Sequence, residues 1–171
     1  MSRPYPDALA VSRKVLRVVI KLNLLMGVLI LALLIASLVA EGPVMGALGA
    51  KPSSTLYLGM RLIMVIGIFS VPLAHVVLTR LLEIVETVRL GDPFVAENAA
   101  RLETIAWVVL GLELLHFAVG AIASAASSEA HPLDIDWNFS VTRWLAVLLL
   151  FVLARVFEQG TRMREDLQGT V

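Results

Sequence analysis

The segment WVVLGLELLHFAVG, residues 107–120, carries Glu113 and His116 inside one of the most apolar parts of the chain. The two side chains are three positions apart, so they lie on the same face of a helix. A Glu-x-x-His pair is the ligand spacing of di-iron helical bundles, which hold their metals with two such pairs and further glutamates. This sequence has one such pair and no other glutamate within an apolar segment. We therefore expect that the protein binds no metal and no cofactor.

Two more ionisable side chains are expected near this pair, His75 in an earlier apolar segment and Arg155 in the last one. If the hydrocarbon begins near Thr104, Glu113 lies about 13 Å deep, because a helix rises about 1.5 Å per residue. A bare charge at that depth costs roughly 3 kcal/mol, so Glu113 should be paired, protonated or turned inward. The cluster of Glu113, His116, His75 and Arg155 then either fixes the helix register, which we favour, or forms a proton or ion relay.

A second group of oxygen and nitrogen ligands occurs in SSEAHPLDIDWN, residues 127–138. It contains Glu129, His131, Asp134 and Asp136. Spacing without a fixed scaffold is weak evidence for a cation site. We favour a solvated turn here, and cation binding stays open.

The composition assigns the chain to the membrane. Of 171 residues, 58% are hydrophobic and only 16% are charged, and the mean hydropathy is +0.87, whereas a soluble domain carries about 25% charged residues. The formal net charge is zero, so direct nucleic-acid binding through bulk positive potential is not expected. Since there is no cysteine, disulfides, thiolate catalysis and cysteine-ligated metals are excluded.

Four apolar segments are long enough to cross the bilayer, because about 20 apolar residues span its ~30 Å core. The first is not a cleaved signal, since its apolar run is too long and no cleavage site follows it. We predict an all-α fold, one membrane domain over residues 1–171 that forms a four-helix bundle whose second and fourth helices extend beyond the membrane. The predicted spans are 22–40, 62–79, 104–128 and 137–157, with a connection at 80–103 and a tail at 158–171.

Lysine and arginine are distributed unevenly between the two sides of this bundle. The leader, the connection and the tail hold 11 of them, and the two other loops hold 3. The positive-inside rule then places both termini in the cytoplasm, here of a bacterial inner membrane. LTRLLE (78–83) and LARVFE (153–158) close the second and fourth spans. They indicate two duplicated helical hairpins related by an axis along the membrane normal. The alternative is that any helix that leaves the membrane on the cytoplasmic side ends in arginine and glutamate.

The cytoplasmic segments indicate a surface for a partner. RLLEIVETVRL (80–90) keeps helical periodicity, and GDPF (91–94) then ends that helix and starts the next one. Such helices either lie in the membrane interface or form a platform for a soluble protein. The docking candidates are Arg80, Glu83, Arg89, Asp92, Pro93, Phe94, Glu97, Asn98, Arg101, Arg162, Arg164, Glu165 and Asp166.

Two of these cytoplasmic segments resemble a known protein family. GDPFVAENAARLETIAW (91–107) and LARVFEQGTRMREDLQGTV (153–171) resemble a bacterial family of four-span membrane proteins, domain of unknown function 2975. Members of that family are often encoded beside a small Cro/CI-type helix-turn-helix regulator. The resemblance implies a membrane partner for a DNA-binding protein and brings no catalytic residue.

We therefore predict a non-enzymatic, membrane-bound regulatory or sensory protein. Its partners are the lipid bilayer and a small cytosolic DNA-binding regulator, and a homo-oligomer stays open. The alternative is a small transport or ion-coupled protein that uses the Glu113 cluster.

Overall fold

The described part of the protein is entirely helical. The computed structural model describes residues 5–48, 54–127 and 140–168, and these ranges contain no strand. The all-α prediction is confirmed for them. The helices are α1 (Tyr5–Val39), α2 (Glu41–Ala47), α3 (Ser54–Arg89), α4 (Ala96–Ala126) and α5 (Val141–Gln168).

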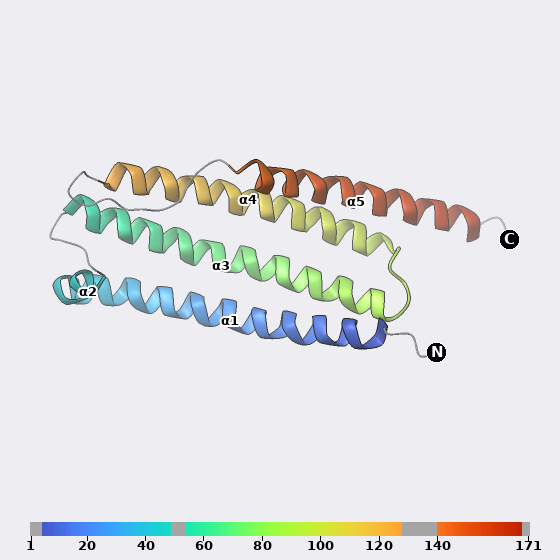
Figure 1. Cartoon of the computed structure of the whole chain (residues 1–171), viewed down its shortest axis with the longest axis horizontal. Helices are drawn as coiled ribbons and strands as arrows, with labels where there is room; N and C mark the ends of the chain where they lie inside the picture. Colours follow the sequence, from blue (N-terminus) through green and yellow to red (C-terminus); the bar gives the residue numbers. More distant parts are fainter. Residues whose placement is uncertain (1–4, 49–53, 128–139, 169–171) are drawn as a thin grey trace.

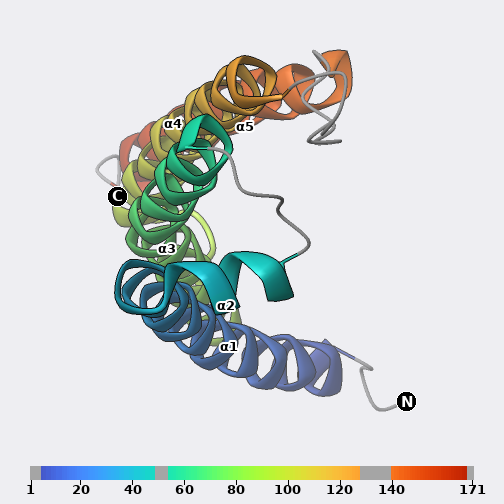
Figure 2. The ribbon, with the colours of Figure 1, turned by 90° about the vertical axis from the view of Figure 1, so that its left-hand side faces the viewer.

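The four long helices form an open, curved row. α1 packs against α3, α3 against α4 and α4 against α5, while the short α2 contacts α1 and runs across the end of its axis (Figure 2). Seen end on, the row describes an arc (Figure 2). The predicted four-helix bundle therefore stays a prediction, and the described helices pack as neighbours in a row. Apolar side chains that face lipid need no protein cover, because lipid tails are as apolar as they are.

Three of the described helices are long and apolar enough to cross a membrane. They are the segments Ala8–Val39, Thr55–Arg89 and Ala96–Ala126, whose most apolar 18-residue stretches have mean hydropathies of 2.7, 2.3 and 2.0. α5 is not among them, and its apolar part lies between Arg143 and Arg155. The fourth span, expected at 137–157, begins outside the described residues, so it stays a prediction.

Both chain ends and the turn between α3 and α4 lie at one end of the molecule (Figure 1). We call this the charged end and define it by residues 80–103 and 155–168. The connection through α2 lies at the opposite end. α3 continues as an unbroken helix to Arg89 and α5 to Gln168, as expected for helices that extend past the apolar region. α5 begins beside the middle of α4 and extends beyond the α3–α4 turn (Figure 1).

Small and polar side chains set the contacts between helices. A Cβ atom added to Gly27 would lie 2.9 Å from Val71 Cγ1, and one added to Gly59 would overlap the Cβ of Ala126. The Asn23 amide donates a hydrogen bond to the Val71 carbonyl across α1 and α3, at 3.0 Å. Close backbone approach of this kind supplies the van der Waals contact that joins helices in lipid.

Candidate functional site at the charged end

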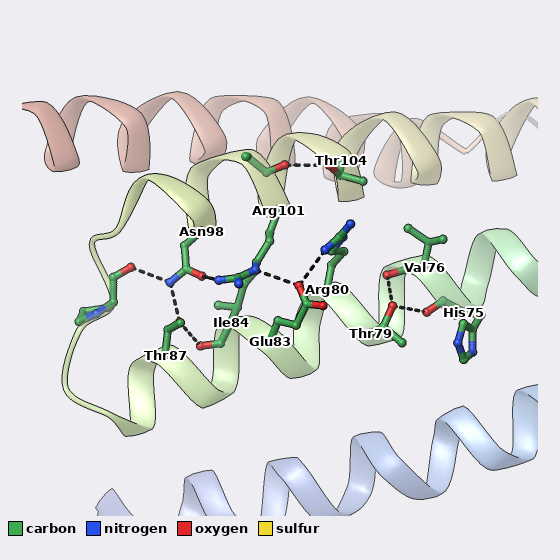
Figure 3. A network of polar contacts seen from close by, with 12 residues as sticks. His75, Val76, Thr79, Arg80, Glu83, Ile84, Thr87, Asn98, Arg101 and Thr104 are labelled. Atoms are coloured by element: carbon green, nitrogen blue, oxygen red, sulfur yellow. Dashed lines mark hydrogen bonds and ion pairs between the residues drawn. The ribbon is translucent and has the colours of Figure 1, made fainter.

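Asn98, at the start of α4, holds the α3–α4 turn together. Its side chain is fully buried. The amide nitrogen donates to Thr87 Oγ1 at 2.7 Å and to the Pro93 carbonyl at 2.9 Å, and the amide oxygen accepts from the Arg101 guanidinium at 2.8 Å (Figure 3). Gly91, within the turn, has φ +87°, which glycine adopts without a steric penalty. The amide therefore links the end of α3, the turn and the first two turns of α4.

A shared carboxylate extends this network along α3. Glu83 Oε2 accepts hydrogen bonds from Arg80 on the same helix and from Arg101 on α4, each at 2.9 Å (Figure 3). The neighbouring Glu86 joins α3 to α1 through Arg13, at 3.6 Å. These ion pairs fix the three helices against one another at the charged end.

The end of α5 is fastened to the same turn by a group that we call the tail clasp: Asp92, Phe94, Phe157, Gly160 and Arg164. Arg164 forms an ion pair with Asp92 and donates to the Phe94 carbonyl at 3.2 Å. The rings of Phe94 and Phe157 lie 5.3 Å apart. The absence of a side chain at Gly160 leaves room for the Phe94 ring, since a Cβ there would lie 3.2 Å from it. The clasp makes the turn and the tail one continuous surface.

The structure divides the docking candidates into exposed residues and residues that are buried or half-buried, and Asp92 and Pro93 in the turn are half-buried. Asn98 is buried and cannot meet a partner, so its assignment to docking is corrected to a structural role. Arg80, Glu83 and Arg101 are partly buried in the network around it. Glu165 has no described side chain. The candidates that are exposed are Arg89, Phe94, Glu97, Arg162, Arg164 and Asp166.

A groove between α4 and α5 was not anticipated from the sequence. It encloses about 490 Å³. The sequence does contain a signal for this groove. The residues that line it on each helix have the spacing of one helical face, and four of them are alanines. α4 contributes Ala96, Ala99, Ala100, Glu103 and Trp107, and α5 contributes Phe151, Ala154, Arg155, Glu158, Thr161 and Arg162.

The rim of this groove carries a chain of ion pairs. Glu158 accepts from Arg155 and from Arg162, each at 2.7 Å. The hydrogen bond from Arg155 and then the charge of Arg162 lower the pKa of the Glu158 carboxyl below its usual value. Glu158 is thus ionised at neutral pH. The side chains of Arg155 and Arg162 stay mostly exposed, at 75% and 72%, and each guanidinium has further N–H groups besides those bonded to Glu158.

The apolar helices hold an ion pair that was not predicted from the sequence. Arg143, rather than Arg155, approaches Glu113, with 3.8 Å between Nη1 and Oε2. The reason is that α5 starts beside the middle of α4. Arg155 instead lines the groove, as does Glu103. Glu103 precedes Glu113 by ten positions on α4, which is about 15 Å along the helix.

The two histidines of the expected cluster lie apart along the helix axis. Gly59 of α3 lies against Ala126 of α4, and Glu83 of α3 bonds to Arg101 of α4. Because the two helices are antiparallel, His75, which lies between Gly59 and Glu83, is opposite the part of α4 near residue 110. That position is about six residues, or roughly 9 Å, from His116. Among the described residues, His75 Nδ1 and His116 Nε2 are buried and have no hydrogen-bond partner.

No cluster of three or more His, Asp or Glu side chains suited to a metal occurs in the described ranges. The acidic group around His131, which also includes Glu129, Asp134 and Asp136, lies outside them.

A chain whose described residues contain several apolar helices of membrane-spanning length is a multi-pass membrane protein. Residues 36–171 match the model of a family described as "Protein of unknown function (DUF2975)", and the chain belongs to that family. The resemblance seen in the sequence is thereby confirmed. Neither a curated protein nor a solved structure matches the chain.

Proposed function

We propose that this protein is a non-enzymatic, membrane-bound regulatory or sensory protein that docks a cytosolic partner on its charged end. The observation that carries the proposal is the tail clasp, in which Arg164 and Phe157 hold the end of α5 against Asp92 and Phe94. A surface that is already ordered avoids part of the entropy cost of binding. Exposed Phe94, with Glu97 and Arg164 beside it, offers the aromatic and arginine contacts enriched at protein interfaces.

The proposal includes an orientation of the protein in the membrane. The charged end lies on the same side as both termini (Figure 1), and the leader, connection and tail on this side together hold 11 of the 14 arginines and lysines. The positive-inside rule therefore favours exposure of this side to the cytoplasm of a bacterial inner membrane. α5, with the residues that precede it, then supplies the fourth span. A partner reaching this end from the cytoplasm is a small helix-turn-helix regulator.

An internal duplication is part of the proposal. α1 with α3 and α4 with α5 are two antiparallel pairs. Arg80 and Glu83 on α3 form an ion pair at 2.9 Å, and Arg155 and Glu158 on α5 form one at 2.7 Å. The same pair closes the same helix of each hairpin, which supports the repeat.

The test is recovery of the partner from the native host. The tagged full-length chain is purified in mild detergent, and the soluble proteins that stay bound are identified by mass spectrometry. We expect a small DNA-binding protein, and we expect its loss when Gly160→Leu displaces Phe94 and opens the clasp. Lys14→Glu is the matched control, because Lys14 is exposed on α1 and outside the clasp. Recovery of no DNA-binding protein, or equal recovery from Gly160→Leu, would exclude docking on this surface.

A second candidate is ion-coupled transport. It is favoured by the pairing of Glu113 with Arg143 inside the apolar helices and by the unpartnered nitrogens of His75 and His116, because intramembrane ionisable groups often mark ion paths. Proton flux into liposomes that contain the purified chain distinguishes the two functions. Flux that is lost in Glu113→Gln, with partner capture unchanged, favours transport. Absence of flux in the unaltered chain excludes it.

A further inference from the structure

We propose that the groove between α4 and α5 binds one molecule of a phospholipid whose headgroup carries both a phosphate and a primary ammonium. The headgroup lies against Arg155, Arg162 and Glu103, and an acyl chain extends toward Trp107 and Phe151. The proposal is independent of partner docking.

The groove has the shape that such a molecule needs. It extends along α4 from Ala96 to Trp107, a rise of about 16 Å, which is longer than a headgroup alone. Its volume of about 490 Å³ lies within the range of small-molecule sites. Ala99 and Ala100 project too little to fill it.

The two ends of the groove differ in polarity in the direction a lipid requires. Trp107 and Phe151 pack edge to face, with ring centroids 5.1 Å apart, at the end nearer the apolar middle of α4. Arg162 and Thr161 line the end nearer the tail. An amphipathic molecule aligned with the helices therefore places its polar part toward the charged end.

Charge identifies the headgroup. Two arginines, Arg155 and Arg162, and two glutamates, Glu103 and Glu158, line the groove, and their formal charges sum to zero. Each guanidinium donates to Glu158 and keeps other N–H groups for phosphate oxygens. Glu103, whose negative charge acts on Arg155, can accept from an ammonium. A zwitterionic headgroup matches both signs, whereas an anionic headgroup leaves Glu103 unmatched.

The experiment measures which lipid lies beside Trp107. The tryptophans elsewhere are replaced by Trp137→Phe and Trp144→Phe, and the chain is placed in vesicles of equal parts phosphatidylethanolamine and phosphatidylglycerol. Only one of the two lipids carries brominated chains, which quench tryptophan fluorescence on contact. We expect quenching by brominated phosphatidylethanolamine to be roughly threefold stronger than by brominated phosphatidylglycerol, since exposed ion pairs are individually weak.

Variants test whether the groove causes the preference. Arg155→Gln with Arg162→Gln removes the phosphate donors and should equalise the two lipids. Ala100→Leu fills the groove and should do the same, and the charge variant decides the matter if Ala100→Leu fails to fold. Lys14→Gln, at the same end of the molecule but outside the groove, should keep the preference. Equal quenching in the unaltered groove, a preference for phosphatidylglycerol, or a preference that survives the charge variant would overturn the proposal.

Discussion

Asn98 shows how one buried polar side chain can organise a helix connection. Its amide has hydrogen bonds to Thr87, to the Pro93 carbonyl and to Arg101. A buried amide without partners would be costly, but a satisfied one fixes each group that it touches. Because α4 begins only two residues earlier, at Ala96, the amide couples the geometry of the turn to the direction of α4.

Replacing Asn98 should therefore destabilise the charged end. We expect Asn98→Leu to lower the free energy of unfolding by about 2–4 kcal/mol, because three hydrogen bonds are lost and the Pro93 carbonyl keeps no side-chain donor. The measurement is denaturant unfolding of the purified chain in detergent.

The control for this variant is Thr104→Val, whose hydroxyl bonds only the Ala100 carbonyl of its own helix among the described groups. It should change the free energy of unfolding by less than about 0.5 kcal/mol. Equal effects of the two substitutions would contradict the role assigned to Asn98.

At the scale of the helices, close approach decides the packing. Gly59 on α3 lies against Ala126 and Ile122 of α4, at the end opposite the charged end. Lipid provides little hydrophobic drive for helices to associate, so contact distance matters more than burial. The small residues here determine how α3 and α4 align, and that alignment brings Glu83 to Arg101.

The pair Gly59→Ala and Gly111→Ala tests this point. A Cβ at Gly59 overlaps Ala126, whereas one at Gly111 has no neighbour within 4 Å. We expect Gly59→Ala to destabilise the chain by about 1–3 kcal/mol, as overpacking does. Gly111→Ala should be neutral or stabilising by up to about 1 kcal/mol, because alanine is the better helix former. Thermal unfolding of both variants in the same detergent gives the comparison, and a stabilising Gly59→Ala would refute the close contact.

At the scale of the whole molecule, the open row leaves large apolar surfaces uncovered. Along α1, Val15, Leu22 and Leu29 are each more than half exposed. Such surface would be a liability in water, but it is normal where lipid is the solvent. The row also places both termini at the charged end.

Accessibility labelling checks the sidedness of this arrangement. The chain has no cysteine, so single substitutions report one site each. Gly42→Cys lies in α2, with nothing within 4 Å of its Cβ position, and Arg162→Cys lies at the charged end. In spheroplasts, a membrane-impermeant maleimide should label the first variant directly and the second only after permeabilisation, as the positive-inside rule requires. The reverse pattern would invert the proposed topology.

Local pattern was enough to predict much of this protein. Composition and apolar length identified three membrane-length helices, and the GDPF segment located the break between α3 and α4, where Gly91 has a positive φ. These features depend on near neighbours in the chain, since hydropathy, periodicity and the freedom of glycine act within one or two turns.

Tertiary structure alone decided how the helices align. The sequence suggested that Arg155 lies in one polar cluster with Glu113, whereas the offset of α5 along α4 brings Arg143 to Glu113 and leaves Arg155 beside the groove. It also suggested Asn98 for docking, whereas the turn buries it. The offset between two helices depends on which small side chains allow close contact across them, and no periodicity within one helix contains that information.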